Sequence, residues 1–250
     1  MSKNVLLRIA QYERHLDDEF QLDLARTIVK AKIRNSRKVI QRFLNNHPEF
    51  DFAKELQLIG ETLKKLDNQR SVNSLMGSEG IAGAAYFQAF GQMFLKDFQF
   101  QTRTRRPPKD PVNALLSFGY TLLTNEILAL ITAHGLDPHI GFLHGIVYGR
   151  PSLALDIVEE FRHPVIDRFV LSLLNHKKLQ HNDFEEKENG VYLNTDGRKT
   201  FFKYYDELMQ RAVRGENPRL DLRALLKRQV RAIAATIKSN APYKPYQFRA

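Results

Sequence analysis

The 250-residue sequence contains no cysteine and no tryptophan. Without cysteine the chain can form neither a disulfide bond nor a zinc site built from thiolates, and it suits a reducing compartment. The sequence also has no uninterrupted run of eighteen apolar residues, so we expect that it does not span a membrane. Residues 1–13 carry charge in every turn, which is unlike a signal peptide. These absences predict a protein of the cell interior.

Acidic residues are in the minority. The chain has 28 Asp and Glu against 38 Lys and Arg, which gives a formal net charge of +10. A surface with this balance attracts polyanions such as nucleic acids. The hydrophobic fraction of 43% is sufficient for a real core in a chain of this length. The composition therefore favours a globular protein that binds DNA or RNA.

Strand signals are scarce as well. Apolar residues recur at helical spacing over most of the chain, including the segments from Phe20 to Asn45 and from Leu75 to Phe98. Only the segment from Phe184 to Leu193 indicates strands, with Asn189-Gly190 placed between two short arms as a type I′ turn would require. The sequence thus predicts a mainly α fold with one short β-hairpin near residues 184–193.

One predicted helix has clear end signals. Asp110 is suited to be an N-cap, and Pro111 follows it at the first helical position. The apolar pattern runs on to about His134, where Gly135 can end the helix in a left-handed conformation.

The predicted helix from Phe20 to Asn45 is strongly basic outside its apolar stripe. Its Lys and Arg residues are Arg26, Lys30, Lys32, Arg34, Arg37, Lys38 and Arg42. Such faces are often simply solvated, and only the net charge of the whole chain makes nucleic acid the better expectation.

Candidate chemistry is concentrated in three short segments. His144 ends a Gly141-Phe142-Leu143-His144 stretch, and Asp156 and Glu159 follow at i and i+3 on one face of a predicted helix. Earlier in the chain, Glu79 lies between Gly77 and Gly80. One imidazole with two or three carboxylates, and no thiolate, suits Mg²⁺ or Mn²⁺. Together with the positive charge, this set predicts metal-dependent chemistry on DNA or RNA.

Each of these residues also has an ordinary structural interpretation. Glu79 could be an acid placed at a helix start by the helix dipole. His144 could be a loop or core hydrogen-bonding residue, and Asp156 and Glu159 could belong to a solvated helix face. The separate signals are weak, and they gain weight only in combination.

A loop rich in Arg and Pro precedes Asp110. It contains Arg103, Arg105 and Arg106, and no acidic residue occurs from Gln101 to Pro108. The loop could be a simple linker. Guanidinium groups suit phosphate oxygens, however, so we expect these three arginines to contact the DNA backbone.

The order and the sequences of these motifs resemble a known family, the CRISPR-associated spacer integrase, which is the first of the Cas core proteins. The resemblance covers nearly the whole chain, and the segments that carry it are Lys32–Asn35, Leu75–Gly80, Arg106–Tyr120, Gly141–His144, Asp156–Arg162, Gly190–Leu193 and Tyr243–Pro245.

This resemblance implies a metal-dependent DNA endonuclease and integrase of the prokaryotic cytoplasm. Such proteins insert captured DNA into a CRISPR array together with a small second Cas core protein, and they form homodimers. The resemblance implies that Glu79, His144 and Glu159 are the metal ligands, and that Asp156 is a nearby acid that supports the site. The implied cofactor is Mg²⁺ or Mn²⁺.

The sequence departs from the family pattern at its start. Family members begin with a β-rich domain of several dozen residues that helps to form the homodimer, whereas Met1 leads here almost directly into the helical catalytic region. We therefore expect residues 1–250 to form a single α-helical catalytic domain, and dimerisation stays open. Two other functions are alternatives: a hydrolytic nuclease for branched or damaged DNA, and a basic DNA-binding module without catalysis.

Overall fold

The computed structural model describes residues 4–213, 220–239 and 241–249. Up to residue 134 the elements are α1 (Val5–His15), α2 (Asp18–Asn46), α3 (Ala53–Lys65), the 3₁₀ turn η1 (Leu66–Asn68), α4 (Val72–Gly91) and α5 (Pro111–His134). From residue 152 onward they are α6 (Ser152–Phe161), the π turn η2 (Arg162–Asp167), α7 (Arg168–Asn175), the 3₁₀ turn η3 (His181–Asp183), β1 (Phe184–Lys187), β2 (Gly190–Leu193), α8 (Thr195–Met209) and α9 (Leu222–Ser239). The predicted mainly α fold with one hairpin is confirmed.

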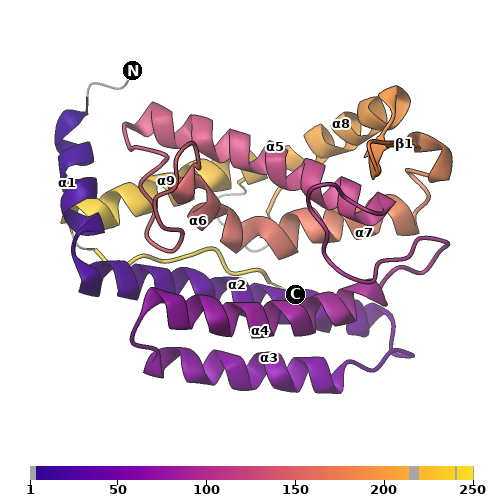
Figure 1. Cartoon of the computed structure of the whole chain (residues 1–250), viewed down its shortest axis with the longest axis horizontal. Coiled ribbons are helices and arrows are strands. Elements are labelled where there is room, and N and C mark those ends of the chain that lie inside the picture. The colour runs from indigo at the N-terminus through magenta and orange to yellow at the C-terminus, as the bar shows by residue number, and fades with distance from the viewer. Residues whose placement is uncertain (1–3, 214–219, 240, 250) are drawn as a thin grey trace.

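The helices form two layers (Figure 1). One layer consists of α2, α3 and α4, and the other contains α5, α6, α7 and α9, with the C-terminal segment running between them (Figure 1). The helix α2 joins the layers because it contacts α3 and α4 on one side and α6 on the other. Its buried apolar residues Leu24, Ile28 and Ala31 follow the helical period that the sequence predicts.

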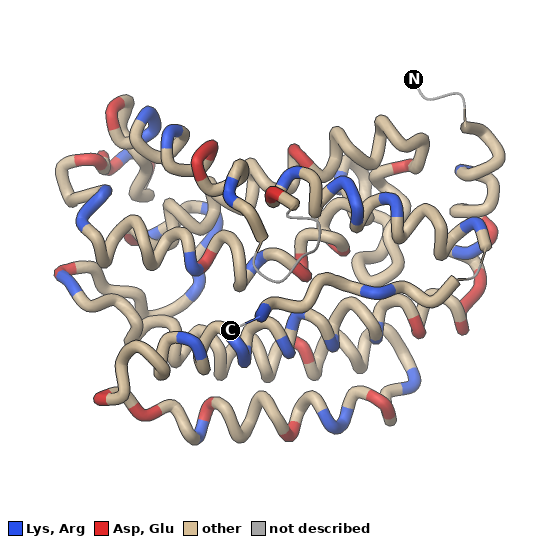
Figure 2. Tube along the Cα trace, turned by 180° about the vertical axis from the view of Figure 1, so that it is seen from behind, with Lys and Arg blue, Asp and Glu red and all other residues tan. Residues whose placement is uncertain are grey.

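Six of the seven basic residues of α2 are half-buried or exposed, and Figure 2 marks the basic positions along the chain in blue. Lys30, for example, pairs at the surface with Asp67 of η1. Lys32 is the exception, because it is only 8% exposed. The expectation that Lys32 belongs to the basic outer faces of α2 is therefore wrong.

The helix α5 begins and ends as predicted. The Asn113 amide donates to the Asp110 carboxylate over 2.8 Å, Pro111 is the first helical residue, and Gly135 ends the helix at φ 88°. By length and composition alone α5 could cross a membrane. In this fold its apolar side chains belong to the protein core: Leu115 and Ile127 are fully buried, and the helix packs against α6 and α9.

The helix α4 ends earlier than the apolar pattern predicts. The spacing of apolar residues predicts a helix to Phe98, whereas α4 stops at Gly91. A Cβ atom at Gly91 would lie 2.6 Å from the Phe100 carbonyl oxygen, so the returning chain passes directly over this glycine. Phe98 and Phe100 are still buried, and they reach the core from the loop instead of from the helix.

The hairpin turn lies one residue earlier than predicted. Its two turn residues are Glu188 and Asn189, both at positive φ, and Gly190 pairs with Lys187. A Cβ atom at Gly190 would lie 2.7 Å from Pro107 Cβ, and the next residue, Val191, donates its amide to the Pro108 carbonyl over 2.9 Å. Gly190 therefore allows the hairpin to pack closely on the Arg- and Pro-rich loop, and Glu188 and Asn189 adopt the positive φ angles of the turn.

The C-terminal segment is irregular, as expected, and it is held by buried polar groups. The Asn35 side-chain amide donates to the Tyr246 carbonyl over 3.0 Å and accepts from the Phe248 amide over 2.9 Å. The fully buried Glu160 carboxylate accepts from the Tyr246 amide over 2.7 Å and from the Tyr243 hydroxyl. Burial raises the pKa of Glu160 to about 7, although these donors act in the opposite direction.

Candidate active site

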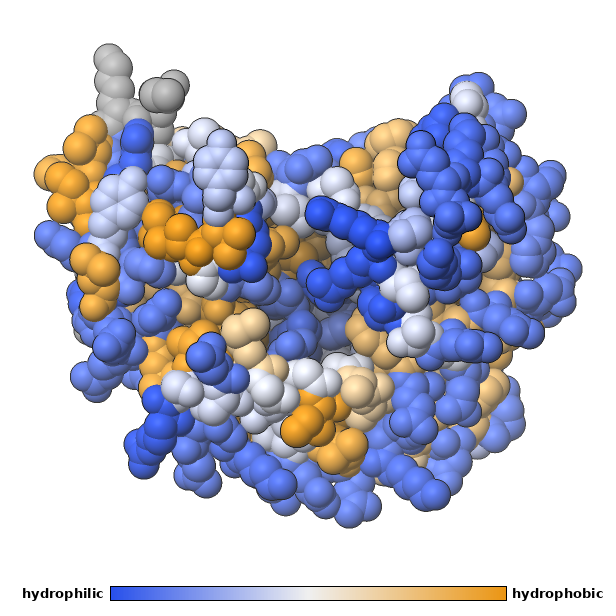
Figure 3. Space-filling view, in the orientation of Figure 1, coloured by the Kyte–Doolittle hydropathy of each residue, from blue (hydrophilic) through white to orange (hydrophobic). Residues whose placement is uncertain are grey.

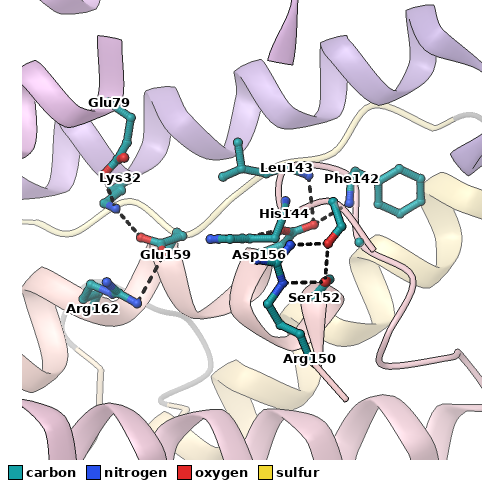
Figure 4. A network of polar contacts seen from close by, with 12 residues as sticks. Lys32, Glu79, Phe142, Leu143, His144, Arg150, Ser152, Asp156, Glu159 and Arg162 are labelled. Carbon is teal, nitrogen blue, oxygen red and sulfur yellow. Dashed lines mark hydrogen bonds and ion pairs between the residues drawn. The ribbon is translucent and has the colours of Figure 1, made fainter. Parts of the chain in front are cut away.

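Asp156 organises the loop that carries His144. This carboxylate is fully buried on α6. One of its oxygens accepts from the amides of Phe142 and Leu143 over 2.6 and 3.1 Å, and the other accepts from the amide and from Nδ1 of His144 over 2.9 and 2.8 Å (Figure 4). Four donors satisfy the carboxylate, so Asp156 has a positioning role in this arrangement and is not free to bind an ion.

The same contact orients the His144 ring. An ionised carboxylate can only accept, so His144 Nδ1 carries a proton, and Nε2 is the ring nitrogen left for another partner. Histidine ligands of metals are commonly held in this way, with the second ring nitrogen bonded to a carboxylate. The His144 ring lies between Asp156 and Glu159 (Figure 4), and its side chain is 22% exposed. The ring is thus prepared to offer Nε2 beside Glu159.

Close packing fixes both ends of the loop. A Cβ atom at Gly141 would lie 2.8 Å from the His144 carbonyl oxygen and 2.8 Å from Ser152 Cβ, so no other residue fits without displacement. Further along, the Ser152 hydroxyl donates to the Gly145 carbonyl over 2.9 Å, and Arg150 donates to the same carbonyl. Beyond Gly145 the tip is exposed and apolar, at Ile146, Val147 and Tyr148.

Lys32 joins the two predicted acidic ligands. Its ammonium group forms ion pairs with Glu79 Oε1 and, at 2.5 Å, with Glu159 Oε2 (Figure 4). Glu79 lies two turns inside α4, and not at its start, so the helix-start interpretation of this acid is wrong. Residues from α2, α4 and α6 therefore meet at one point between the two layers.

Arg162 binds the other oxygen of Glu159. Its guanidinium lies 3.2 Å from Glu159 Oε1 and 4.5 Å from the centre of the Tyr120 ring. Burial alone would raise the pKa of the Glu159 carboxyl, but Arg162 and Lys32 hold this pKa well below its usual range. Glu159 is 2% exposed and stays ionised because cations surround it.

A buried polar network lies behind Arg162. The Asp167 carboxylate accepts from His163 Nδ1 over 2.7 Å and from the Tyr120 hydroxyl. Both His163 and Asp167 belong to the π turn η2, where Pro164 lacks the amide that a regular α-helix needs. The wider turn directs Arg162 and Asp167 toward Tyr120, which faces them from α5.

The predicted metal ligands are thus brought to one region. Glu79 and Glu159 share one cation, and His144 lies next to Glu159. Within the described ranges, no three His, Asp or Glu side chains stand close enough together to hold an ion as they are placed. The donor set nevertheless fits a divalent ion, because Glu159 Oε2 is buried with only the ion pair to Lys32 and no hydrogen bond. The ligand assignment stays a prediction.

The three arginines of the loop before α5 differ in their surroundings. Arg103 donates to the Asn113 side chain over 2.8 Å and to the Ser117 hydroxyl over 2.9 Å, and burial lowers its pKa. Arg105 and Arg106 are exposed. Arg103 therefore uses its N–H groups in hydrogen bonds to side chains of α5, and the two exposed arginines are the better candidates for phosphate contacts.

Two important residues of this site were not identified from the sequence as functional. Lys32 is one of seven basic residues in the same predicted helix, so its residue type does not distinguish it. Arg162 follows Glu159 and Glu160 closely and is not part of any recognisable motif of basic residues. The position of Lys32 relative to the apolar stripe was the one available signal of its burial. Lys32 lies one position after the buried Ala31 and four after the buried Ile28, so it is on the same side of the helix as the stripe.

One face of the molecule is hollowed. Figure 3 shows a depression with hydrophilic side chains between the two layers, flanked by apolar groups. The depression lies between the layer that contains α4, which carries Glu79, and the layer that contains α6, which carries Glu159. A bound substrate could reach the space between the layers from this side.

Comparison with known proteins adds a family to this geometry. The family described as CRISPR associated protein Cas1 matches residues 1–207. The CRISPR-associated endonuclease Cas1 of Leptospira interrogans is 39% identical over 250 residues, which cover 95% of this chain and 97% of that protein. Among solved structures, a casposase bound to its integration product has a TM-score of 0.88 at 28% identity and is matched over 98% of this chain and 68% of its own. A chain of a partial Cas6-RT-Cas1–Cas2 complex has a TM-score of 0.87 at 25% identity over 99% of this chain and 74% of its own.

Proposed function

This chain belongs to the CRISPR-associated Cas1 family, and from this membership we propose that it is a DNA endonuclease and integrase that inserts captured DNA into a CRISPR array. The observation that carries the proposal is that Lys32 links Glu79 with Glu159 between the two helical layers, with the His144 ring next to Glu159. The casposase neighbour was solved with an integration product, and the Leptospira relative is named as an endonuclease. Both support chemistry on phosphodiester bonds.

The residues of the site suit this reaction. In strand transfer, the 3′-hydroxyl of the incoming DNA attacks a phosphorus atom of the target strand, and the 3′ oxygen of that strand leaves. Negative charge grows on the phosphate oxygens and on the leaving oxygen. Arg162 and Lys32 supply positive charge close to the place where this negative charge would develop. Water attacking in place of the 3′-hydroxyl would give hydrolysis, and the placement of DNA decides between the two.

We propose that the site also holds Mg²⁺ or Mn²⁺. Glu79 and Glu159 would supply carboxylate oxygens, and His144 would supply Nε2. When bound, such an ion would stabilise the developing charge and lower the pKa of the attacking hydroxyl or water. Asp156 would hold His144 in the tautomer that this requires.

We further propose DNA and a small second Cas core protein as partners. The neighbour from the Cas6-RT-Cas1–Cas2 complex, with a TM-score of 0.87 over nearly the whole chain, supports the second partner. The net charge of +10 supports the first. The homodimer implied by the family resemblance stays a prediction.

A strand-transfer assay tests the proposal. A short labelled duplex with 3′-hydroxyl ends is incubated with a supercoiled plasmid that bears the repeat, with Mn²⁺, and with or without the small partner. We expect label to enter the plasmid when both proteins are present, and His144→Ala to abolish this while DNA binding persists.

The alternatives give different results in the same assay. Cleavage of branched substrates without any joining would indicate the hydrolytic nuclease. DNA binding that neither needs nor responds to Mn²⁺, with no cleavage or joining, would indicate a binding module without catalysis. Strand transfer by His144→Ala at the wild-type rate would remove His144 from the chemistry.

A further inference from the structure

We propose that Lys32 is an internal competitor of the divalent ion, so that loading of the site with metal is coupled to the arrival of a DNA phosphate. This inference rests on the proposed function, because it concerns the same site. It concerns a residue for which the ligand set alone provides no role.

The geometry places Lys32 where the ion would be held. Its ammonium group is within ion-pair distance of Glu79 on one side and Glu159 on the other, and these are two of the three proposed ligands (Figure 4). A divalent ion cannot share both carboxylates with an ammonium group in that position. Binding of the ion therefore requires Lys32 to leave at least one of its partners.

Burial makes the competition substantial. The Lys32 side chain is 10% exposed and that of Glu159 is 3% exposed, so water screens their attraction poorly. A surface pair such as Lys30 with Asp67, whose Asp67 side chain is 67% exposed, contributes far less. Lys32 is thus held in place by an attraction that the ion must replace.

The balance of charge indicates what happens to Lys32 after displacement. Glu79 and Glu159 neutralise Lys32 and Arg162 in the present arrangement, so these four groups have no net charge. Adding a divalent ion gives the same groups a charge of +2. A DNA phosphate would offset part of this excess and would offer the displaced ammonium a new partner.

Coupling of this kind is reciprocal. If DNA favours the position in which Lys32 has left the carboxylates, DNA strengthens metal binding, and the metal strengthens DNA binding by the same factor. The site would then be loaded mainly when a substrate is present, which limits cleavage without a strand to join.

The test measures Mn²⁺ affinity directly, from the loss of the free-ion signal in electron paramagnetic resonance. Wild type, Lys32→Met and Lys30→Met are titrated with and without a short duplex, and circular dichroism confirms that each chain is folded. Lys32→Gln serves as a second variant, because it removes the charge and keeps a hydrogen-bond donor. Lys30→Met is the matched control on the same helix.

We expect Lys32→Met and Lys32→Gln to bind Mn²⁺ roughly tenfold more tightly than wild type without DNA, because a unit charge at ion-pair distance is removed. DNA should strengthen Mn²⁺ binding by wild type and Lys30→Met about fivefold or more, and have a smaller effect in the two Lys32 variants. Equal affinities of wild type and both Lys32 variants, or an equal effect of DNA in all chains, would overturn the role of Lys32. Absence of Mn²⁺ binding in every chain would overturn the metal site itself, and the two failures are therefore distinguishable.

Discussion

Asp156 binds both the backbone amide and the ring of His144 through a single carboxylate oxygen, at 2.9 and 2.8 Å. The same side chain thereby sets the path of the loop and the orientation of the imidazole. Because its second oxygen accepts from Phe142 and Leu143, the carboxylate is saturated by this loop. The position of His144 thus depends on a residue twelve positions later in the chain.

Replacement of Asp156 by Asn tests whether this carboxylate holds the loop and the His144 ring in position for metal binding. An amide NH₂ would face two buried N–H donors, so we expect Asp156→Asn to lower the free energy of unfolding by about 2–4 kcal/mol in urea titrations. Mn²⁺ affinity should fall about 10–100-fold, as for other supporting residues of metal sites. Asp196→Asn on α8, where the side chain is 83% exposed, is the control. Wild-type Mn²⁺ affinity in Asp156→Asn would contradict the positioning role.

Gly141 should tolerate no side chain, whereas Gly145 in the same loop should. A Cβ atom at Gly141 meets three atoms at 2.8 Å, and one at Gly145 meets nothing within 4 Å. We expect Gly141→Ala to cost about 1–3 kcal/mol of stability and to shift the loop, while Gly145→Ala stays close to wild type. Thermal unfolding with and without Mn²⁺ measures both effects. Equal behaviour of the two variants would mean that the loop adapts freely.

The arginines before α5 should divide into two kinds. Arg103→Ala should mainly destabilise the protein, because Asn113 and Ser117 lose a buried partner. The double variant Arg105→Ala, Arg106→Ala should fold normally and weaken binding to every DNA sequence by a similar factor. Its salt dependence should be reduced by about one unit of slope for each lost phosphate contact. DNA titrations at several salt concentrations measure this, and an unchanged slope would favour the basic face of α2 as the binding surface.

The C-terminal segment should depend on the Tyr243 hydroxyl. This group donates to the buried Glu160 carboxylate, and removing it leaves a buried acceptor with one partner fewer. We expect Tyr243→Phe to lower the free energy of unfolding by about 1–3 kcal/mol. Tyr148→Phe is the control, since Tyr148 is fully exposed. Faster proteolysis near residue 243 should accompany the loss, and equal stability of the two variants would show that the hydroxyl contact is dispensable.

The sequence predicted elements best where local chemistry decides them. Asp110, Pro111 and Gly135 define α5 through a cap, a fixed φ and a left-handed residue, and each acts over a few neighbouring residues. The end of α4 at Gly91 and the turn at Glu188-Asn189 depend instead on packing against Phe100 and Pro107. Contacts of that kind join segments distant in the chain, and no local pattern reports them.

The candidate site shows the same division. Glu79, His144 and Glu159 were identified by residue type, spacing and family resemblance, whereas the partnership of Lys32 with two of them was not. A lysine among seven basic residues of one helix carries no mark of burial. Its role follows only from the meeting of α2, α4 and α6, which is a property of the tertiary structure.

The most direct test of the account is the position of Mn²⁺ in crystals of the protein, located by its anomalous scattering. We expect one strong peak between the two helical layers, bonded to carboxylate oxygens of Glu79 and Glu159 and to Nε2 of His144, with Asp156 still bound to His144 Nδ1. A peak at other residues, or no peak at these three in crystals soaked to saturation, would contradict the proposed metal site.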